Sequence, residues 1–103
     1  MNDLKKLGFA LGLAQKAGKV ASGDYAVKAA IKSGKVRLLL IAEDAAENSK
    51  KDLKYLADVY KVRVKEALTR VELGLAIGKA QRTALAIVDS NFAEMINKGF
   101  IKE

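Results

Sequence analysis

Apolar residues at helical spacing open the chain. One face of this first segment carries Leu4, Leu7, Leu11 and Ala14. Because steps of three and four residues keep side chains on one face of a helix, the pattern predicts a helix over Asp3–Ala17. Gly18 ends it, since a glycine just beyond the last periodic residue is typical of a helix C-terminus. Lys19–Ala21 is then predicted to be a very short strand.

A second helix is predicted between two glycines. Ser22 is the expected N-cap, and Asp24 falls in the first turn, where a negative charge suits the helix dipole. Gly34 closes the helix. The residues expected on its buried face are Val27, Ala30 and Ile31.

Two apolar runs predict the centre of a sheet. Val36–Ala42 is apolar on both faces apart from Arg37, and Thr83–Val88 is a second run of this kind. A strand that is apolar on both faces suits a central position covered by helices. Val62 and Val64, by contrast, alternate with charged residues, which predicts a short, half-exposed strand.

Capping patterns predict two further helices. Ser49 is followed three residues later by Asp52, and Thr69 by Glu72, as in capping boxes at helix N-termini. The second of these helices is short and is expected to end at Gly78. The inner face of the first is expected to carry Leu53, Leu56, Ala57 and Tyr60.

The last predicted helix starts near Asp89 or Ser90, buries Phe92 and Ile96, and ends at Gly99. The element order is therefore α-β-α-β-α-β-α-β-α. Such alternation predicts an α/β fold, a three-layer α/β/α sandwich around a small mixed sheet of about four strands, formed by residues 1–103 as a single domain.

Sites in folds of this class gather at loops beyond the strand ends. The three loops that fit this position are Lys19–Asp24, Glu43–Asn48 and Gly78–Thr83.

The residue types that are absent restrict the chemistry. Among 103 residues there is no histidine and no cysteine. This excludes the usual zinc sites and the Ser-His-Asp and Cys-His nucleophilic systems, and we expect no metal and no cofactor. No apolar run approaches the roughly 20 residues of a membrane span, and Lys5 and Lys6 precede a glycine-broken stretch rather than a signal peptide. The expected location is cytoplasmic, without a membrane partner.

The positive charge is concentrated in the first part of the chain. The net charge is +7, and residues 1–40 contain eight basic residues against two acidic ones. A basic region on a compact domain suggests a polyanionic partner, with nucleic acid the leading candidate.

Two glycine-lysine pairs fail as nucleotide-binding loops. Five residues separate Gly12 from Gly18 where such a loop needs four, and Val20 stands where Ser or Thr would bind magnesium. Gly74 and Gly78 fail on spacing too and precede a strand. Gly18 and Gly78 are better explained as helix ends.

The start of the second helix has side chains suited to RNA. An exposed helix N-terminus offers free N–H groups, Gly23 allows close backbone approach, and Tyr25 either stacks on a base or packs against the first helix. In the basic loop Lys79–Arg82, the two cations would hold phosphates. Glu43 and Asp44 follow a buried strand, but neighbours on an extended chain point to opposite faces, which disfavours a shared acid-base role.

The same loops carry a family resemblance. The segments Gly12–Val20, Ser22-Gly23, Val36–Ala45 and Leu73–Gly78, in this order, make the chain resemble the kink-turn-binding ribosomal-protein family (the L-seven-Ae and L-thirty-e superfamily), most closely its short bacterial branch called YlxQ. The resemblance implies an α/β/α sandwich that binds structured RNA. The helix after the glycine would enter the groove at sheared G·A pairs, and the loop Gly78–Thr83 would cover an extruded base.

The resemblance also assigns charged positions. Asp44 matches an acidic position near the RNA, and Lys19 matches a basic one. Archaeal members read the G·A bases with an Asn-Glu pair and a following Lys, whose places here hold Tyr25, Ala26 and Ala29. The residues one position away, which are the candidates to take over, are Asp24 and Lys28. This departure bears on kink-turn specificity more than on RNA binding, because phosphate contacts position and base contacts specify.

The leading hypothesis is a non-catalytic RNA-binding protein that recognises kink-turn-like RNA and is ribosomal or associated with the ribosome. Its expected RNA-contacting residues are Lys19, Ser22, Gly23, Asp24, Tyr25, Lys28, Glu43, Asp44, Lys79, Ala80, Gln81 and Arg82.

Two alternatives from other classes stay open. One is a small nucleotide-binding or acid-base enzyme that uses Glu43, Asp44 and Lys19. The other is a protein-binding adaptor whose basic face is incidental.

Overall fold

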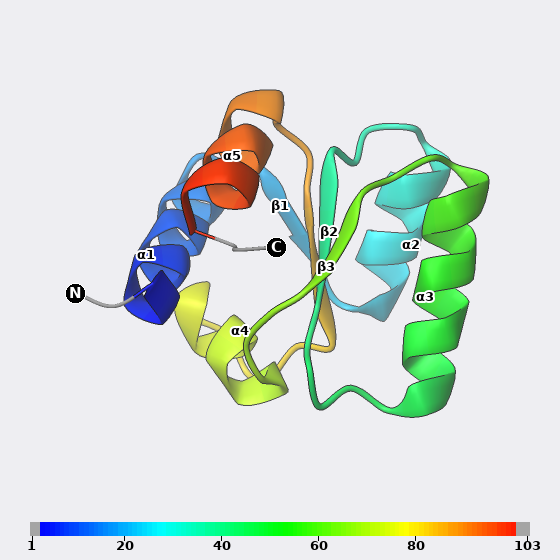
Figure 1. Ribbon diagram of the computed structural model, residues 1–103, viewed down its shortest axis with the longest axis horizontal. Coiled ribbons are helices and arrows are strands. Elements are labelled where there is room, and N and C mark those ends of the chain that lie inside the picture. Colours follow the sequence, from blue (N-terminus) through cyan, green and yellow to red (C-terminus); the bar gives the residue numbers. More distant parts are fainter. Residues whose placement is uncertain (1–2, 101–103) are drawn as a thin grey trace.

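The computed structural model describes residues 3–100, and the side chains of residues 5–98 (Figure 1). Five helices alternate with four strands, and a π-helical turn, η1, ends the described chain. Within these residues no helix has both the length and the apolar character to cross a membrane. The elements are α1 (Asp3–Lys16), β1 (Val20–Ser22), α2 (Asp24–Lys32), β2 (Leu38–Ile41), α3 (Glu47–Val59), β3 (Val64–Glu66), α4 (Arg70–Ala76), β4 (Ala84–Ile87), α5 (Ser90–Met95) and η1 (Ile96–Phe100).

The four strands form one mixed sheet in the order β1-β4-β2-β3. β4 is antiparallel to both of its neighbours, and β2 is parallel to β3. The two longest apolar strands thus pair at the centre, with Leu39 opposite Ala86. The mixed four-stranded sheet predicted from the sequence is confirmed.

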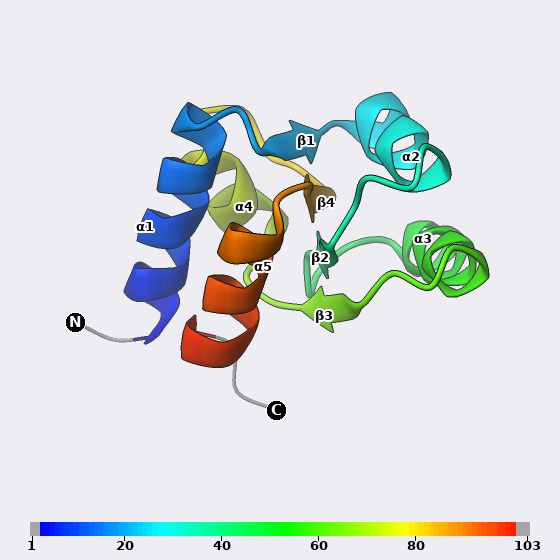
Figure 2. The same cartoon turned by 90° about the horizontal axis from the view of Figure 1, so that it is seen from above.

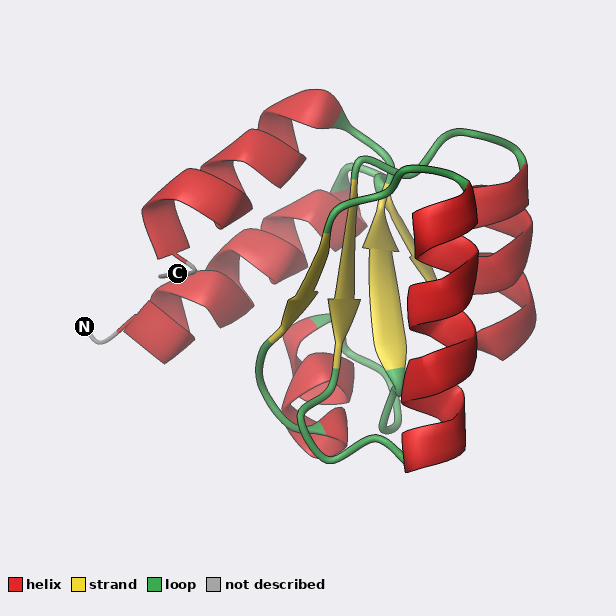
Figure 3. Ribbon diagram, turned by 45° about the vertical axis from the view of Figure 1, so that its right-hand side comes forward, coloured by secondary structure: helices red, strands yellow, loops and turns green. Residues whose placement is uncertain are grey.

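Helices cover both faces of this sheet. α2 and α3 lie together on one face, and α1, α4 and α5 lie on the other (Figures 1, 2 and 3). This confirms the three-layer α/β/α sandwich. All eight residues of β2 and β4 are buried, because each of these strands contacts a helical layer on both sides.

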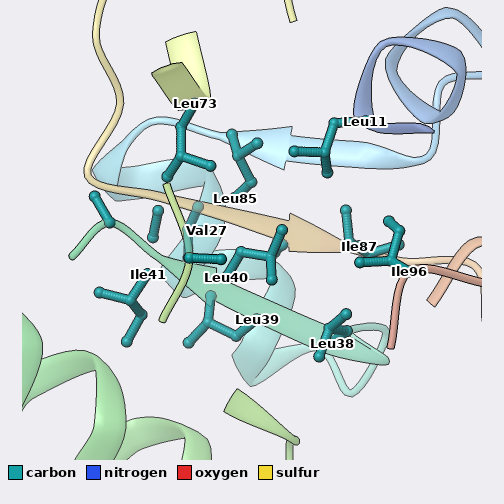
Figure 4. Packing of buried hydrophobic residues seen from close by; sticks show 14 of the residues in the cluster. Leu11, Val27, Leu38, Leu39, Leu40, Ile41, Leu73, Leu85, Ile87 and Ile96 are labelled. Atoms are coloured by element: carbon teal, nitrogen blue, oxygen red, sulfur yellow. The ribbon is translucent and has the colours of Figure 1, made fainter. Parts of the chain in front are cut away.

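The core is almost wholly aliphatic. Figure 4 shows Leu11 and Leu73 from one helical layer and Val27 from the other, around the side chains of β2 and β4. Full burial of one such side chain stabilises the fold by roughly 1.5–3 kcal/mol. The predicted inner residues Leu7, Leu11 and Ala14 of α1 are buried, whereas the side chain of Leu4 lies outside the described residues.

Helix ends that depend on local chemistry follow the predictions. Thr69 Oγ1 accepts a hydrogen bond from Glu72 N at 3.2 Å, and Glu72 Oε1 accepts one from Thr69 N at 2.8 Å. Asp89 Oδ2 accepts a hydrogen bond from Phe92 N at 2.9 Å and thereby caps α5. Gly34 follows α2 with φ +78°, a left-handed conformation that glycine adopts without steric cost.

Two predicted helix starts are wrong. Ser22 is the last residue of β1, paired with Leu85, and Gly23 is the N-cap of α2. Ser49 lies inside α3, which begins at Glu47 with no side-chain capping bond at its start. In the first case pairing with a distant strand outweighs the local capping preference, and in the second the helix begins nearly one turn earlier, with Ala46 as its N-cap.

Several boundaries and burial predictions also change. β2 and β4 are shorter than the apolar runs that predicted them, because the flanking residues enter loops. Tyr60 is 42% exposed, since α3 ends at Val59 and the chain turns before its ring reaches the core. Phe92 is only partly buried. The last helix does not end at Gly99, because η1 extends to Phe100 and packs against α1.

The strand directions create two distinct edges. β1, β2 and β3 run the same way and β4 runs against them. The site edge, at the bottom of Figure 1, therefore contains the loops that follow β1, β2 and β3 and the loop that precedes β4. The opposite edge, at the top, contains the segments that precede β1, β2 and β3 and the one that follows β4.

Candidate nucleic-acid interface

The N-terminus of α2 is open at the site edge. Gly23 has φ +91° and ψ 148°, and its missing side chain leaves the first turn without a side-chain capping bond. The backbone N–H groups of this turn and the positive end of the helix dipole are thus available to an anion or a base edge. Asp24 and Lys28 flank the opening, and Lys28 Nζ lies 3.5 Å from Asp24 Oδ2.

Tyr25 projects into solvent from the same turn. Its side chain is 86% exposed, so it does not pack against α1. Of the two roles that the sequence left open, the structure favours the exposed ring, which is free to stack on a base.

Arg82 connects the loop before β4 to β1. Its Nη1 donates to the carbonyl oxygens of Ala80 and Gln81, both at 3.1 Å, and its Nε lies 3.4 Å from Ser22 Oγ. The guanidinium group has five N–H donors. The two on Nη2 have no hydrogen-bond partner among the residues that the structure describes, so Arg82 both shapes its loop and retains donors for a phosphate.

A hollow of about 170 Å³ lies between these two elements. Its walls combine apolar side chains from α2 and α3 with polar groups of the loop before β4. A space that is several times the ~30 Å³ share of one water molecule, with polar groups at its rim, suits part of a nucleotide. The lining residues are Gly23, Asp24, Val27, Leu53, Gln81, Arg82, Thr83 and Ala84.

Gly74 lets this loop lie directly on α4. A Cβ atom at Gly74 would be 2.2 Å from the Ala80 carbonyl oxygen and 2.9 Å from Gln81 Cα. Its own carbonyl oxygen accepts a hydrogen bond from Lys79 N at 2.9 Å. We did not predict this role from the sequence, although a glycine inside a helical pattern is a signal of close packing.

Asp44 connects the loop after β2 to the start of α4. Its Oδ1 accepts a hydrogen bond from Arg70 N at 2.8 Å and lies 3.5 Å from Arg70 Nε. The carbonyl oxygen of Arg70 in turn accepts a hydrogen bond from Arg82 N at 3.0 Å. Arg70, which the sequence analysis did not single out, thus joins the acidic loop to the basic one.

Two lysines of α3 form hydrogen bonds with the loop after β2 and with the end of β3. Lys50 Nζ donates to the Glu43 carbonyl oxygen at 2.7 Å and to Glu66 Oε1 at 3.1 Å, and Lys54 Nζ donates to Glu66 Oε2 at 2.6 Å. These hydrogen bonds, the one from Lys54 first, hold the pKa of Glu66 below its usual range. The carboxylate therefore stabilises the site edge as an anion.

We predict a pH-dependent effect of Glu66→Gln. A carboxylate with a lower pKa in the folded protein stabilises it above the unfolded pKa, about 4.3 for glutamate, and loses this contribution as the pH falls through the folded value. The variant should lose less than about 1 kcal/mol of unfolding free energy at pH 7, because the group is partly exposed. Denaturant unfolding should show the difference from the parent shrinking below about pH 4. Asp52→Asn, at an exposed carboxylate on α3, is the control; an equal loss at pH 3 and pH 7 would contradict the prediction.

The structure brings most of the predicted site residues together. Ser22–Tyr25, Glu43-Asp44 and Lys79–Arg82 all lie at the site edge, and Lys28 lies one turn into α2. Lys19 does not join them. Its carbonyl oxygen accepts a hydrogen bond from Val88 N at 3.0 Å, which places it at the opposite edge, about 10 Å away along the three residues of β1.

The position of Lys19 also bears on the enzyme hypothesis. Glu43 and Asp44 lie at the far end of the sheet from Lys19, so these three residues do not form one site. Among the side chains that the structure describes, no three of the His, Cys, Asp or Glu types gather to hold a metal ion.

Comparisons with known proteins extend over core and site edge alike. The sequence pattern of the ribosomal protein L7Ae/L30e/S12e/Gadd45 family matches residues 5–97. The chain is 38% identical to the RNA-binding protein YlxQ of Bacillus subtilis (strain 168) over 86 residues, 84% of this chain and 86% of that protein. It is 33% identical to the large ribosomal subunit protein eL30 of Neurospora crassa over 97 residues, 92% of this chain and 89% of that protein. A solved structure of a protein with unknown function from Bacillus halodurans C matches with a TM-score of 0.85 and 33% identity, and covers 89% of this chain and 93% of that one.

Proposed function

The chain belongs to the ribosomal protein L7Ae/L30e/S12e/Gadd45 family, and on that premise we propose that it is a non-catalytic protein that binds structured, kink-turn-type RNA through its site edge. The observation that carries the proposal is the hollow between the open N-terminus of α2 and the loop that holds Arg82. Names of relatives support the same class of function, since one is an RNA-binding protein and another a ribosomal subunit protein.

Each part of the site edge has a role in this proposal. The N–H groups after Gly23 and the free Nη2 of Arg82 bind phosphates, and Lys79 adds a further exposed cation. Tyr25 stacks on an unpaired base. Ala80 and Gln81 form the loop surface that covers the extruded base.

Asp24 and Lys28, at the start of α2, contact the base edges in this proposal. The Asp24 carboxylate accepts hydrogen bonds from base amino groups, and Lys28 donates to acceptors in the groove. Their contact at 3.5 Å holds both side chains beside the helix N-terminus before RNA arrives. Relative to the Asn-Glu pair of the archaeal members, this arrangement preserves a hydrogen-bond donor and an acceptor at the same end of the helix. The RNA is ribosomal or ribosome-associated, in line with the ribosomal relative.

A binding comparison between two RNAs tests the proposal. The first is a kink-turn RNA, and the second is the same RNA with its sheared G·A pairs changed to Watson–Crick pairs. We expect the first to bind at least tenfold more tightly in 0.1 M salt, because two lost base contacts cost about 1–3 kcal/mol each. Equal affinities would reject kink-turn recognition, and no binding of either RNA would reject RNA binding by this edge.

A thermal-shift screen separates this proposal from the nucleotide-binding enzyme. The kink-turn RNA should raise the melting temperature, as any ligand of the folded state does. Free nucleotides should leave the melting temperature unchanged. Stabilisation by a nucleotide and not by RNA would favour the enzyme.

A further inference from the structure

The opposite edge of the sheet carries a dense group of cations. The helices α1, α2 and α3 end there, and the segment that follows each of them contributes basic side chains (Figures 1 and 2). All of them are exposed, and among the described side chains, those of residues 5–98, none has a carboxylate partner. We call this surface the basic edge; it consists of Lys16, Lys19, Lys32, Lys35, Arg37 and Lys61.

Hydrogen bonds between strand ends place two of these cations side by side at the opposite edge. Val88 N donates to the Lys19 carbonyl oxygen at 3.0 Å, and Arg37 N donates to the Ile87 carbonyl oxygen at 2.8 Å. Lys19 and Arg37 therefore lie on either side of the end of β4. Because neighbouring strands are about 4.8 Å apart, their backbones are about 10 Å from each other, and the segment before β3 follows one strand farther on.

The two edges differ in how their charges are balanced. At the site edge, carboxylates pair with Lys28, Arg70, Lys50 and Lys54. At the opposite edge Glu94 pairs with Arg63 at 2.7 Å and with Lys98 at 3.3 Å, and neither of these cations belongs to the basic edge. Unpaired like charges repel one another, so this surface is electrostatically unfavourable without an anionic partner.

Helix dipoles account for only part of the basic edge. Lys16 and Lys32 lie in the last turns of α1 and α2, where a cation stabilises the negative end of the dipole. Lys35, Arg37 and Lys61 lie beyond the helix ends, where that effect has fallen off. These three cations need another explanation.

We propose that the basic edge binds a second stretch of RNA backbone, separate from the RNA at the site edge and without sequence preference. Its lysines and arginine bind successive phosphates, and release of their counterions drives the association. Tyr60, 42% exposed and next to Lys61, offers a ring for an unpaired base. The protein would thus connect two RNA segments on opposite sides of its sheet. The inference uses RNA as the partner named in the proposed function, but it does not depend on kink-turn recognition.

A double variant tests this surface. Lys35→Gln with Arg37→Gln removes two cations of the basic edge without touching the core or the site edge. The probes are a minimal kink-turn RNA and the same RNA extended by a single-stranded tail of mixed sequence. For the parent protein, we expect the tail to increase affinity and to steepen the dependence of affinity on salt.

The variant should lose the added affinity and the steeper salt dependence that the tail gives the parent, while its binding of the minimal RNA stays nearly the same. Two lost phosphate contacts correspond to a salt slope smaller by about 1.4 and, near 0.1 M salt, to roughly tenfold weaker binding of the tailed RNA. Binding of the minimal RNA should change by less than twofold. Lys6→Gln with Lys51→Gln, at exposed lysines of α1 and α3 that belong neither to the basic edge nor to the proposed RNA contacts of the site edge, is the charge-matched control and should leave both affinities nearly unchanged.

The outcomes separate this inference from the proposed function. If the parent binds the minimal RNA but the tail adds no affinity, the basic edge has no such role. The same conclusion follows if the control variant weakens tailed RNA as much as the test variant does, or if the test variant weakens both RNAs equally. If the parent binds the tailed RNA but not the minimal RNA, the proposed function at the site edge is wrong and RNA binding by the basic edge is supported.

Discussion

Replacing Gly74 with alanine is expected to lower the free energy of unfolding by about 1–3 kcal/mol. The new Cβ atom would be 2.2 Å from the carbonyl oxygen and 2.7 Å from the carbonyl carbon of Ala80. Both are backbone atoms, which cannot rotate away as a flexible side chain would. The loop that precedes β4 must therefore move, and with it the hydrogen bond from Lys79 N to the Gly74 carbonyl oxygen.

Gly8→Ala is the matched control for this substitution. Gly8 also lies inside a helix, but nothing is within 4 Å of a Cβ atom placed there. Alanine should stabilise the protein at that position by up to about 1 kcal/mol, through its higher helix propensity. Denaturant unfolding of the two variants should give shifts of opposite sign. If Gly74→Ala were as stable as the parent, the close packing of the loop on α4 would be refuted.

The second large effect concerns RNA affinity. Lys28→Ala combined with Arg82→Ala should weaken binding of kink-turn RNA by about 10- to 100-fold, because each side chain contributes on the order of 1 kcal/mol or more through phosphate or base contacts. The slope of affinity against salt should fall by roughly 0.7–0.9, because Arg82 binds a phosphate whereas Lys28 contacts base edges. Titrations at several salt concentrations measure both quantities.

A structural effect of the Arg82 substitution must be separated from loss of contact. Arg82 bonds to two carbonyl groups of its own loop and contacts Ser22, so the unfolding free energy of each variant should be measured beside its affinity. Arg82→Lys retains the charge but not the planar fork of donors. The Arg82→Lys variant should keep the salt slope of the parent protein but only part of its affinity for the RNA. Unchanged affinity and slope in the double variant would refute this assignment of the site.

The candidate site could be predicted only as a set of loops. The sequence marked the segments around Gly23, Glu43 and Lys79, because glycine, acidic and basic residues there follow or precede apolar runs. It could not show that Arg82 contacts Ser22, 60 residues earlier, or that Arg70 joins Asp44 to the basic loop. It also grouped Lys19 with the site, although the length of β1 separates them.

What the sequence by itself determined are the features that depend on neighbouring residues. The order of helices and strands, the capping box at Thr69 and the burial of β2 and β4 follow from side chains within a few positions of one another. Hydrophobic periodicity and backbone capping act at this range, so they can be recognised without the fold.

Only the tertiary structure decided which loops share an edge. The strand order β1-β4-β2-β3 joins segments that are far apart in the chain, and it places Ser22 in a strand where local preference favoured a helix cap. It also divides the basic residues between two edges: at the site edge four of them pair with carboxylates, whereas among the described side chains no cation of the basic edge does. The physical reason is that strand pairing and close backbone packing, as at Gly74, are satisfied between distant residues and override weaker local propensities.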